Sequence, residues 1–182
     1  MSDETVRLLG DDDWALYRAV RLAAIRDAPA ELGADPESEA AAGDDHWRDQ
    51  VGAGRRLVLE RGGQPCGVVS LERSDEEARS AVLSGLWVEP AARSSGVAGR
   101  LVESVVALAA ADGAARLYYW VGTENARAIG FAVNAGFRVT SRRRRARGPA
   151  RAADDTEIAL VLPLGDDGST VPNAGGARPG SR

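Results

Sequence analysis

The segment Leu86–Leu101 contains the residues best suited to chemistry in this chain. It joins an apolar run to a loop of small residues, Arg93–Gly96, and then to the start of a helical pattern. Backbone N–H groups in such a loop point inward and bind phosphate oxygens, and the positive end of the following helix dipole adds to the attraction. Small side chains let an anion approach the backbone, and glycine accepts positive φ at low cost. The segment therefore predicts a pyrophosphate site with one neighbouring cation, Arg93.

Two other phosphate-binding motifs do not fit this segment. A dinucleotide fold requires Gly-x-Gly-x-x-Gly near an early strand and an acidic residue about twenty positions later, and the chain meets neither condition. The nucleotide-binding P-loop requires a lysine. All 23 basic residues of this chain are arginines, so that motif is excluded.

Two motifs resemble those of the GNAT superfamily of N-acetyltransferases. The first is Arg93-Ser94-Ser95-Gly96-Val97-Ala98, preceded by Val88-Glu89-Pro90, which is similar to the family pattern Gln/Arg-x-x-Gly-x-Gly/Ala. The second is Asn125-x-x-Ala128 followed by Gly136-Phe137. The resemblance covers roughly residues 6–164 and is most specific between residues 83 and 137.

The resemblance implies a single-domain α/β fold with three layers. Its mixed, mostly antiparallel sheet would have about seven strands flanked by about four helices. The fourth and fifth strands would run parallel and splay apart, and acetyl-CoA would enter the gap as co-substrate, without a metal. Diverging strands leave unpaired N–H and C=O groups that an amide-bearing ligand can satisfy.

The resemblance also implies which residues hold acetyl-CoA. Its pantetheine arm would pair with the backbone of the fourth strand, and its pyrophosphate would sit on the N–H groups of the loop. The expected contacts are Leu86, Trp87, Val88, Arg93, Ser94, Ser95, Gly96, Val97, Ala98, Gly99, Arg100, Asn125 and Ala128.

The implied reaction is direct transfer of an acetyl group from a thioester to a primary amine of a small molecule or peptide. It needs a base for the amine, a donor for the oxyanion and a proton for the departing thiolate. The backbone N–H of Val88 is expected to serve the oxyanion. Glu89 is the carboxylate nearest the splay, and a water chain or Glu31, as part of the acceptor site, is an equally open choice of base.

The proton donor is where the chain departs from the family. Ala132 stands where the family usually has a tyrosine, seven residues after Asn125. A thiol pKa of about 8.5 makes the thiolate stable enough for water to protonate it. Tyr118 or Tyr119 on the neighbouring strand could substitute, although a core role is the default for aromatic residues in an apolar strand.

Length and composition limit the number of domains and the kinds of site that the chain can contain. A chain of 182 residues is the size of one compact domain. One cysteine and one histidine exclude an intrachain disulfide and a cysteine-cluster metal site. The first residues lack a basic and apolar leader, and no segment reaches the roughly eighteen apolar residues of a membrane span. We therefore expect a cytoplasmic protein without a membrane partner.

Hydrophobic patterns predict an alternation of strands and helices. Asp11–Asp13 should cap a first helix. The resemblance implies that the polar connection 27–45 walls the acceptor site. Beyond residue 164 the composition cannot bury enough apolar area to fold, so we expect a domain over 1–164 and a disordered tail over 165–182. The strands are expected at 6–9, 56–60, 67–72, 81–88, 117–121, 137–145 and 156–162, and the other helices at 97–112 and 125–135.

Charge gives two interpretations of the acceptor. The N-terminal half carries many carboxylates, with Glu31 beside apolar Leu32, and a carboxylate-lined entrance would favour a cationic amine. The run Arg142–Arg147 predicts a solvated hairpin, with an anionic acceptor, the adenosine 3′-phosphate or RNA as alternatives. The net charge of −4 and the 5% aromatic content argue against nucleic acid.

Three classes of function remain at this point. The leading one is the N-acetyltransferase. The second is a degenerate acyl-CoA-binding regulator, which Ala132 suggests, and the third is an RNA-binding module that uses the arginine run. Pairing of two copies of the chain stays open.

Overall fold

Seven strands form one sheet in the order β1-β2-β3-β4-β5-β7-β6. The computed structural model describes residues 4–165, so the predicted tail lies outside the described residues except for Gly165. The strands are β1 (Glu4–Leu8), β2 (Arg55–Arg61), β3 (Gln64–Arg73), β4 (Ser80–Val88), β5 (Arg116–Gly122), β6 (Arg138–Arg145) and β7 (Thr156–Pro163).

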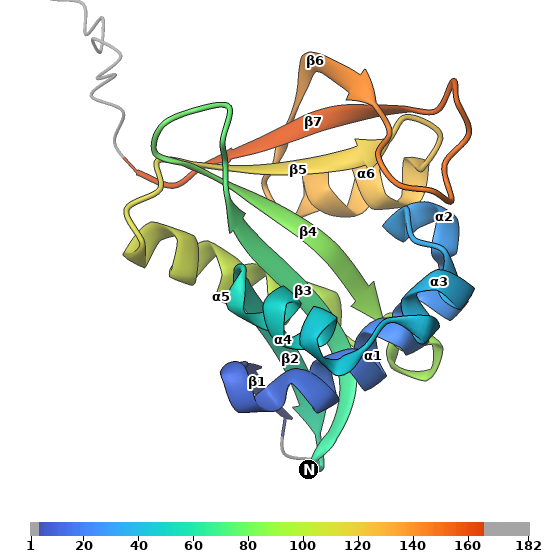
Figure 1. The fold of residues 1–182 in the computed structure, drawn as a ribbon. Helices are drawn as coiled ribbons and strands as arrows, with labels where there is room; N and C mark the ends of the chain where they lie inside the picture. The colour runs from blue at the N-terminus through green and yellow to red at the C-terminus, as the bar shows by residue number, and fades with distance from the viewer. Residues whose placement is uncertain (1–3, 166–182) are drawn as a thin grey trace, which may run out of the picture.

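Helices cover both faces of the sheet (Figure 1). One face packs against α5 and α6, and the other packs against the N-terminal helices. The helices are α1 (Trp14–Asp27), α2 (Pro29–Leu32), α3 (Pro36–Ala41), α4 (Asp44–Gly52), α5 (Val97–Ala111) and α6 (Ala126–Asn134), with short 3₁₀ turns η1 (Asp11–Asp13) and η2 (Pro90–Ala92). This is the mixed α/β fold with three layers that the sequence predicts.

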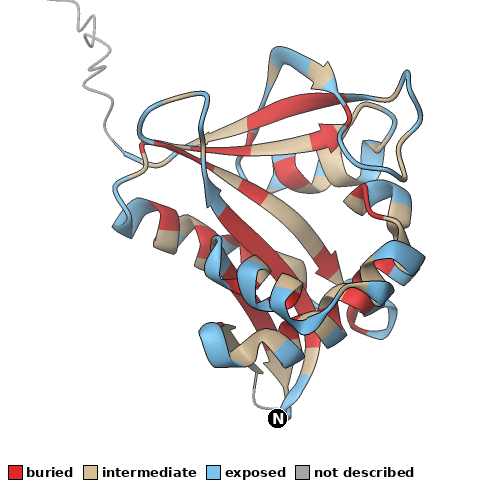
Figure 2. Cartoon of the chain, in the orientation of Figure 1, coloured by how far each residue is buried: buried red, intermediate tan, exposed pale blue. Residues whose placement is uncertain are grey.

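Each face has its own hydrophobic core, because successive side chains of a strand point to opposite sides. Leu57 and Leu59 of β2 join the core under α5 and α6, whereas Val58 between them packs with α1 and α4. Figure 2 shows the buried residues along the central strands. Both helical layers therefore pack on β2, β3 and β4.

The central strands β4 and β5 pair only at their beginnings. Their parallel ladder joins Ser80–Leu83 to Arg116–Tyr119, after which β4 runs on to Val88 and β5 to Gly122 without further pairing. A bulge in β4 accompanies the separation, because Gly85 and Leu86 together lie opposite Val69 of β3, and Gly85 has φ +59°. The predicted splay between the fourth and fifth strands is confirmed (Figure 1).

The polar connection 27–45 contains two short helices, α2 and α3, each of which starts with a proline at its first helical position. One local expectation near the N-terminus needs correction, and it concerns the capping of α1. Asp11–Asp13 form the turn η1 and do not cap α1 with a side chain. The Asp13 carboxylate instead accepts the Gly10 N–H at 2.8 Å and pairs with Arg7.

Gly67 of β3 marks the closest approach of the sheet to α5. A Cβ there would lie 2.9 Å from both Leu101 Cδ1 and Val97 Cγ1. We expect Gly67→Ala to lower the free energy of unfolding by about 1–3 kcal/mol, because the helix must shift to admit a methyl group. Gly52→Ala is the control, since a Cβ there meets nothing within 4 Å. Equal urea denaturation midpoints for Gly67→Ala and the parent would contradict this packing.

Candidate active site

Two cavities meet where β4 and β5 separate. The loop-side cavity, about 440 Å³, lies between the end of β4, the loop before α5, and α6. The hairpin-side cavity, about 510 Å³, lies between α1, α2, the bulge of β4, β5 and the segment that joins β6 to β7. Both are lined by Glu31, Leu86, Tyr119 and Asn125. A group bound in one cavity can therefore reach a group bound in the other through the gap in the sheet.

The loop before α5 presents free backbone donors to the loop-side cavity. Positive φ values at Ser94 (64°) and Gly96 (88°) turn the chain into the helix. The first N–H bonded within α5 is that of Arg100, which reaches the Gly96 carbonyl at 3.1 Å, so those of Val97–Gly99 keep no helical partner. A Cβ at Gly96 or Gly99 would meet nothing within 4 Å. These open donors fit an anion at the start of a 15-residue helix.

Most of the residues predicted to hold acetyl-CoA line the loop-side cavity, but two do not. Ser95 donates its hydroxyl proton to the Ala92 carbonyl at 2.6 Å and accepts a hydrogen bond from Arg61. Arg100 turns away to pair with Glu4 of β1. The predicted residues that line the cavity are Leu86, Trp87, Val88, Arg93, Ser94, Gly96, Val97, Ala98, Gly99, Asn125 and Ala128.

Asp27, at the end of α1, connects β4 to the loop. Its carboxylate accepts a 2.8 Å hydrogen bond from the Trp87 indole N–H and pairs with Arg93. The hydrogen bond from Trp87, together with Arg93, lowers the pKa of Asp27. Arg93 is therefore already neutralised on one side, although it still lines the cavity. The sequence offers no local signal for Asp27, because its two partners lie 60 and 66 residues away.

The end of β4 presents backbone groups of Val88 to the gap. The Glu89 N–H donates to the Cys66 carbonyl of β3 at 2.9 Å. Val88 precedes Glu89 in the chain and lies opposite Gly67 of β3. Because antiparallel partners alternate between bonded and non-bonded pairs, the Val88 N–H and C=O point away from β3, whereas those of Trp87 point toward it. Arg93 Nε donates to the Val88 carbonyl at 3.1 Å. The Val88 N–H is left facing the gap.

The two tyrosines of β5 occupy opposite faces of the sheet. Tyr118 donates its hydroxyl proton to Glu77 at 2.8 Å and lines neither of the two cavities. Tyr119 stacks edge-on against Phe137, with ring centroids 6.3 Å apart, and lines both cavities. Burial, with the Glu31 charge nearby, raises the pKa of Tyr119 to about 12. Its hydroxyl is therefore a protonated group at the junction.

The second motif, in α6, is also at the junction. Asn125 caps the helix, because its side chain accepts the Ala128 N–H at 3.0 Å, and it lines both cavities. Ala132 is fully buried in the core beneath α6. Sequence patterns did not point to Arg127 or Phe131, which also line the loop-side cavity.

Two glycines allow α2 and the segment after β6 to meet beside the hairpin-side cavity. A Cβ at Gly148 would lie 1.7 Å from the Gly33 carbonyl oxygen, so the segment after β6 touches the end of α2 backbone to backbone. Arg151 of that segment donates to the Glu31 carbonyl at 3.0 Å. These contacts hold α2, and with it Glu31, over the gap between β4 and β5.

The two candidate carboxylates differ in position. Glu89 is exposed and lines neither cavity, whereas Glu31 lines both. Of the carboxylates in the N-terminal half that were expected near the acceptor, only Glu31 lines either cavity. The others are Asp11, Asp12, Asp13, Asp35, Glu37, Glu39, Asp44 and Asp45.

The first four residues of the arginine run, Arg142–Arg145, lie on β6, and Arg147 follows the strand. Arg142 pairs with Glu76 and Glu77 and covers the Tyr118 ring at 4.9 Å. Arg144 pairs with buried Glu157 and covers the Trp120 ring at 4.2 Å. These two guanidinium groups are occupied within the protein, which weakens the RNA interpretation.

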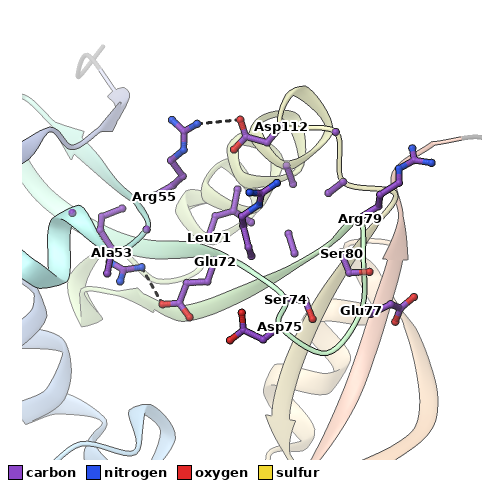
Figure 3. A pocket seen from close by; sticks show the side chains of 18 of the residues that line it. Ala53, Arg55, Leu71, Glu72, Ser74, Asp75, Glu77, Arg79, Ser80 and Asp112 are labelled. Carbon is purple, nitrogen blue, oxygen red and sulfur yellow. Dashed lines mark hydrogen bonds and ion pairs between the residues drawn. The ribbon is translucent and has the colours of Figure 1, made fainter.

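A third hollow, about 1340 Å³, opens at the other end of the sheet (Figure 3). Its lining includes two ion pairs, Arg55 with Asp112 and Arg56 with Glu72, each at 3.1 Å. It lies away from the gap between β4 and β5 and contains none of the predicted site residues.

Across residues 4–165, no helix is long and apolar enough to cross a membrane. The same part of the chain contains no group of three histidine, cysteine or acidic side chains arranged to hold a metal ion.

Comparisons with known proteins agree with this geometry. The model of the acetyltransferase (GNAT) family matches residues 19–137. No curated protein sequence matches the chain significantly. Similar solved structures include yncA, a putative acetyltransferase from Salmonella typhimurium with its cofactor acetyl-CoA (18% identity, all of both chains, TM-score 0.70). A GNAT acetyltransferase from Streptococcus pneumoniae is also similar (15% identity, 90% of this chain and 100% of that one, TM-score 0.71).

The family match spans well over half of the chain, and the fold and the paired cavities agree with it. The chain is a member of the GNAT acetyltransferase family. Members of this family use acetyl-CoA.

The Asp27 contacts predict a pH dependence of stability. Since the folded state lowers the pKa of Asp27, its contribution is present above the unfolded pKa and is lost as pH falls through the folded pKa. We expect Asp27→Asn to lower the urea midpoint at pH 7 and to have a smaller effect at about pH 3. Asp12→Asn, which removes an exposed carboxylate, is the control. A loss of stability that is the same at both pH values would refute the charge-based account.

Proposed function

We propose that this protein is an acetyl-CoA-dependent N-acetyltransferase that moves an acetyl group directly to a primary amine of a small molecule or peptide. The observation that carries the proposal is the junction of two cavities at the gap between β4 and β5. Direct transfer needs both substrates bound at once, with the reacting atoms in contact. One cavity offers backbone donors for phosphates, and the other is open for an acceptor.

Acetyl-CoA fits the loop-side cavity by its chemistry. The unpartnered N–H groups of Val97–Gly99 suit the pyrophosphate, and the Val88 N–H suits an amide or acetyl carbonyl. Exposed Arg127 of α6 adds a cation across the cavity from the loop. When bound, acetyl-CoA supplies the thioester that is cleaved.

Three groups of this chain perform the steps in the proposed reaction. Glu31 accepts a proton from the amine, directly or through water, and the Val88 N–H stabilises the oxyanion. The new N–C bond forms as the C–S bond breaks, and the departing thiolate takes the Tyr119 hydroxyl proton. Glu31 is preferred to Glu89 because only Glu31 lines the cavities.

Tyr119 is the proposed proton donor in place of the tyrosine that Ala132 replaces. The residue lines both cavities, and its hydroxyl has no hydrogen-bond partner within the described residues. The raised pKa keeps this hydroxyl protonated, so it can donate a hydrogen bond to the departing sulfur. Tyr118 is already bonded to Glu77 on the other face of the sheet.

A second candidate function rests on Ala132. If neither Tyr119 nor water delivers a proton to the thiolate, the chain would bind an acyl-CoA as a regulator without turnover. Release of free thiol from acetyl-CoA in the presence of amines, measured beside calorimetric binding of acetyl-CoA, separates the two functions.

The cofactor assignment predicts the effect of a charge at Gly99. We expect Gly99→Glu to weaken acetyl-CoA binding at least about tenfold, because its carboxylate enters the phosphate site, while Gly99→Ala has little effect. Gly99 suits this test better than Gly96, whose φ of +88° strains any other residue. Calorimetry with acetyl-CoA gives the affinities, and thermal unfolding checks the fold. Unchanged affinity of Gly99→Glu would refute the assignment.

The proton-donor assignment predicts different effects at the two tyrosines. Tyr119→Phe should lower kcat about tenfold or more with little change in KM, because the ring still packs on Phe137 but the proton is gone. Tyr118→Phe, the matched control on the other face, should leave kcat near the parent value. Equal rates for Tyr119→Phe and the parent would assign protonation of the thiolate to water.

A further inference from the structure

Arginines dominate the acceptor side of the junction. The hairpin-side cavity is lined by Arg21, Arg56, Arg144, Arg147 and Arg151, against Glu31, Glu72, Glu124 and Glu157. An arginine remains charged at any physiological pH, so its partner determines whether the charge is available to a ligand.

Four of these arginines already have carboxylate partners. Arg56 is buried and pairs with Glu72 at 3.1 Å. Arg144 and Arg151 share the single buried carboxylate of Glu157, at 2.8 and 3.7 Å. Arg147 pairs at the rim with Glu76 at 3.7 Å. Because Arg144 and Arg151 share one carboxylate, this pair of guanidinium groups keeps one positive charge that Glu157 does not offset.

Arg21 is the exception among the five. Within residues 4–165 it has no hydrogen-bond, ion-pair or ring partner, and its side chain is half-buried against the bulge of β4. Its Nη1 lies 3.2 Å from the position that a Cβ on Gly85 would take. The buried Ser70 hydroxyl lies 3.7 Å from the same point, and it also has no partner within that range. An unpaired guanidinium and an unpaired hydroxyl therefore lie beside the same position, where Gly85 has no side chain.

The missing side chain at Gly85 makes this arrangement possible. Gly85 has φ +59°, a conformation that other residues rarely adopt, and a Cβ there would press on Arg21. The same bulge that accompanies the splay of β4 thus leaves room for a cation beside the gap. Free donors of this kind are strong partners for a carboxylate.

We propose that the acceptor is a small amine that also carries a carboxylate, as a free amino acid does, with the carboxylate bound by Arg21 and Ser70. The inference rests on the proposed acetyltransferase function and names the substrate class of its acceptor cavity. The amine of such a molecule points toward Glu31 at the junction, where the acetyl group is transferred. The cavity volume of about 510 Å³ suits a small ligand.

This assignment replaces the expectation of a cationic acceptor. That expectation depended on many N-terminal carboxylates, and only Glu31 among them lines either cavity. A polycationic amine would meet the unpaired charge of Arg21 without a compensating carboxylate, apart from Glu31 and exposed Glu124. A molecule with one amine and one carboxylate places its carboxylate at Arg21 and its amine at Glu31.

The experiment compares acceptors that differ only in the carboxylate. Thiol release from acetyl-CoA is measured with a panel of free amino acids, each beside its amide and its decarboxylated amine, and with spermidine as a cationic probe. We expect kcat/KM for the best amino acid to exceed that of its amide and its amine about tenfold or more, the effect of one hydrogen-bonded charge pair.

Variants of α1 test the role of Arg21. Arg21→Gln should raise KM for that amino acid about tenfold to hundredfold, leave its decarboxylated amine unaffected, and leave acetyl-CoA binding unchanged. Arg21→Lys should recover part of the loss. Arg26→Gln is the matched control, because Arg26 is exposed on the same helix and lines neither cavity. Thermal unfolding confirms that each variant is folded.

If kcat/KM for the amides, the decarboxylated amines or spermidine equals or exceeds that for the amino acids, the inference is overturned and the acetyltransferase proposal stands. The same holds if Arg21→Gln keeps the preference of the parent for amino acids over their decarboxylated amines. If no amine releases thiol although acetyl-CoA binds, the acetyltransferase proposal fails. Calorimetry of the same amino acids with the CoA complex then decides the inference. Binding that Arg21→Gln removes would support it, whereas no binding, or equal binding by the variant, would overturn it.

Discussion

The short pairing between β4 and β5 is the constraint on which the rest of the molecule depends. The ladder stops at Leu83 and Tyr119, and from there each strand is held by its other neighbour, β4 by β3 and β5 by β7. On one side of the gap, β2, β3 and β4 have hydrophobic cores on both faces, and on the other side β5 and β7 pack into the core under α5 and α6. The unpaired backbone that remains must be satisfied by a ligand or by water. The position of both cavities follows from this one interruption.

The two sides of the gap use different sources of positive charge. On the loop side the donors are backbone N–H groups at the start of α5, and the nearby Arg93 is largely neutralised by Asp27. On the hairpin side they are arginine side chains, most of them tied to glutamates. Backbone donors suit any pyrophosphate, whereas side chains discriminate between ligands.

Contacts between distant segments give the site its rigidity. Asp27 joins the end of α1 to the indole of Trp87 and to the loop at Arg93. Gly33 and Gly148 bring α2 and the segment after β6 into backbone contact, which holds Glu31 above the junction. The Tyr119 ring packs edge-on against Phe137, and the residue lines both cavities. Each of these residues acts through a partner that is remote in the chain.

Local physics made much of this protein predictable from its sequence. Alternating apolar residues predicted the strands, the small residues from Ser94 to Gly99 predicted a tight turn before α5, and Asn125 predicted a helix cap, because each depends on neighbours in the chain. Other features were decided only by the tertiary structure. The side chains of Ser95 and Arg100 are turned toward Ala92 and Glu4, and Glu89 lies outside the cavities that Glu31 lines. The free charge of Arg21 depends on which arginines found carboxylates across the sheet, and such pairings form only when distant elements meet.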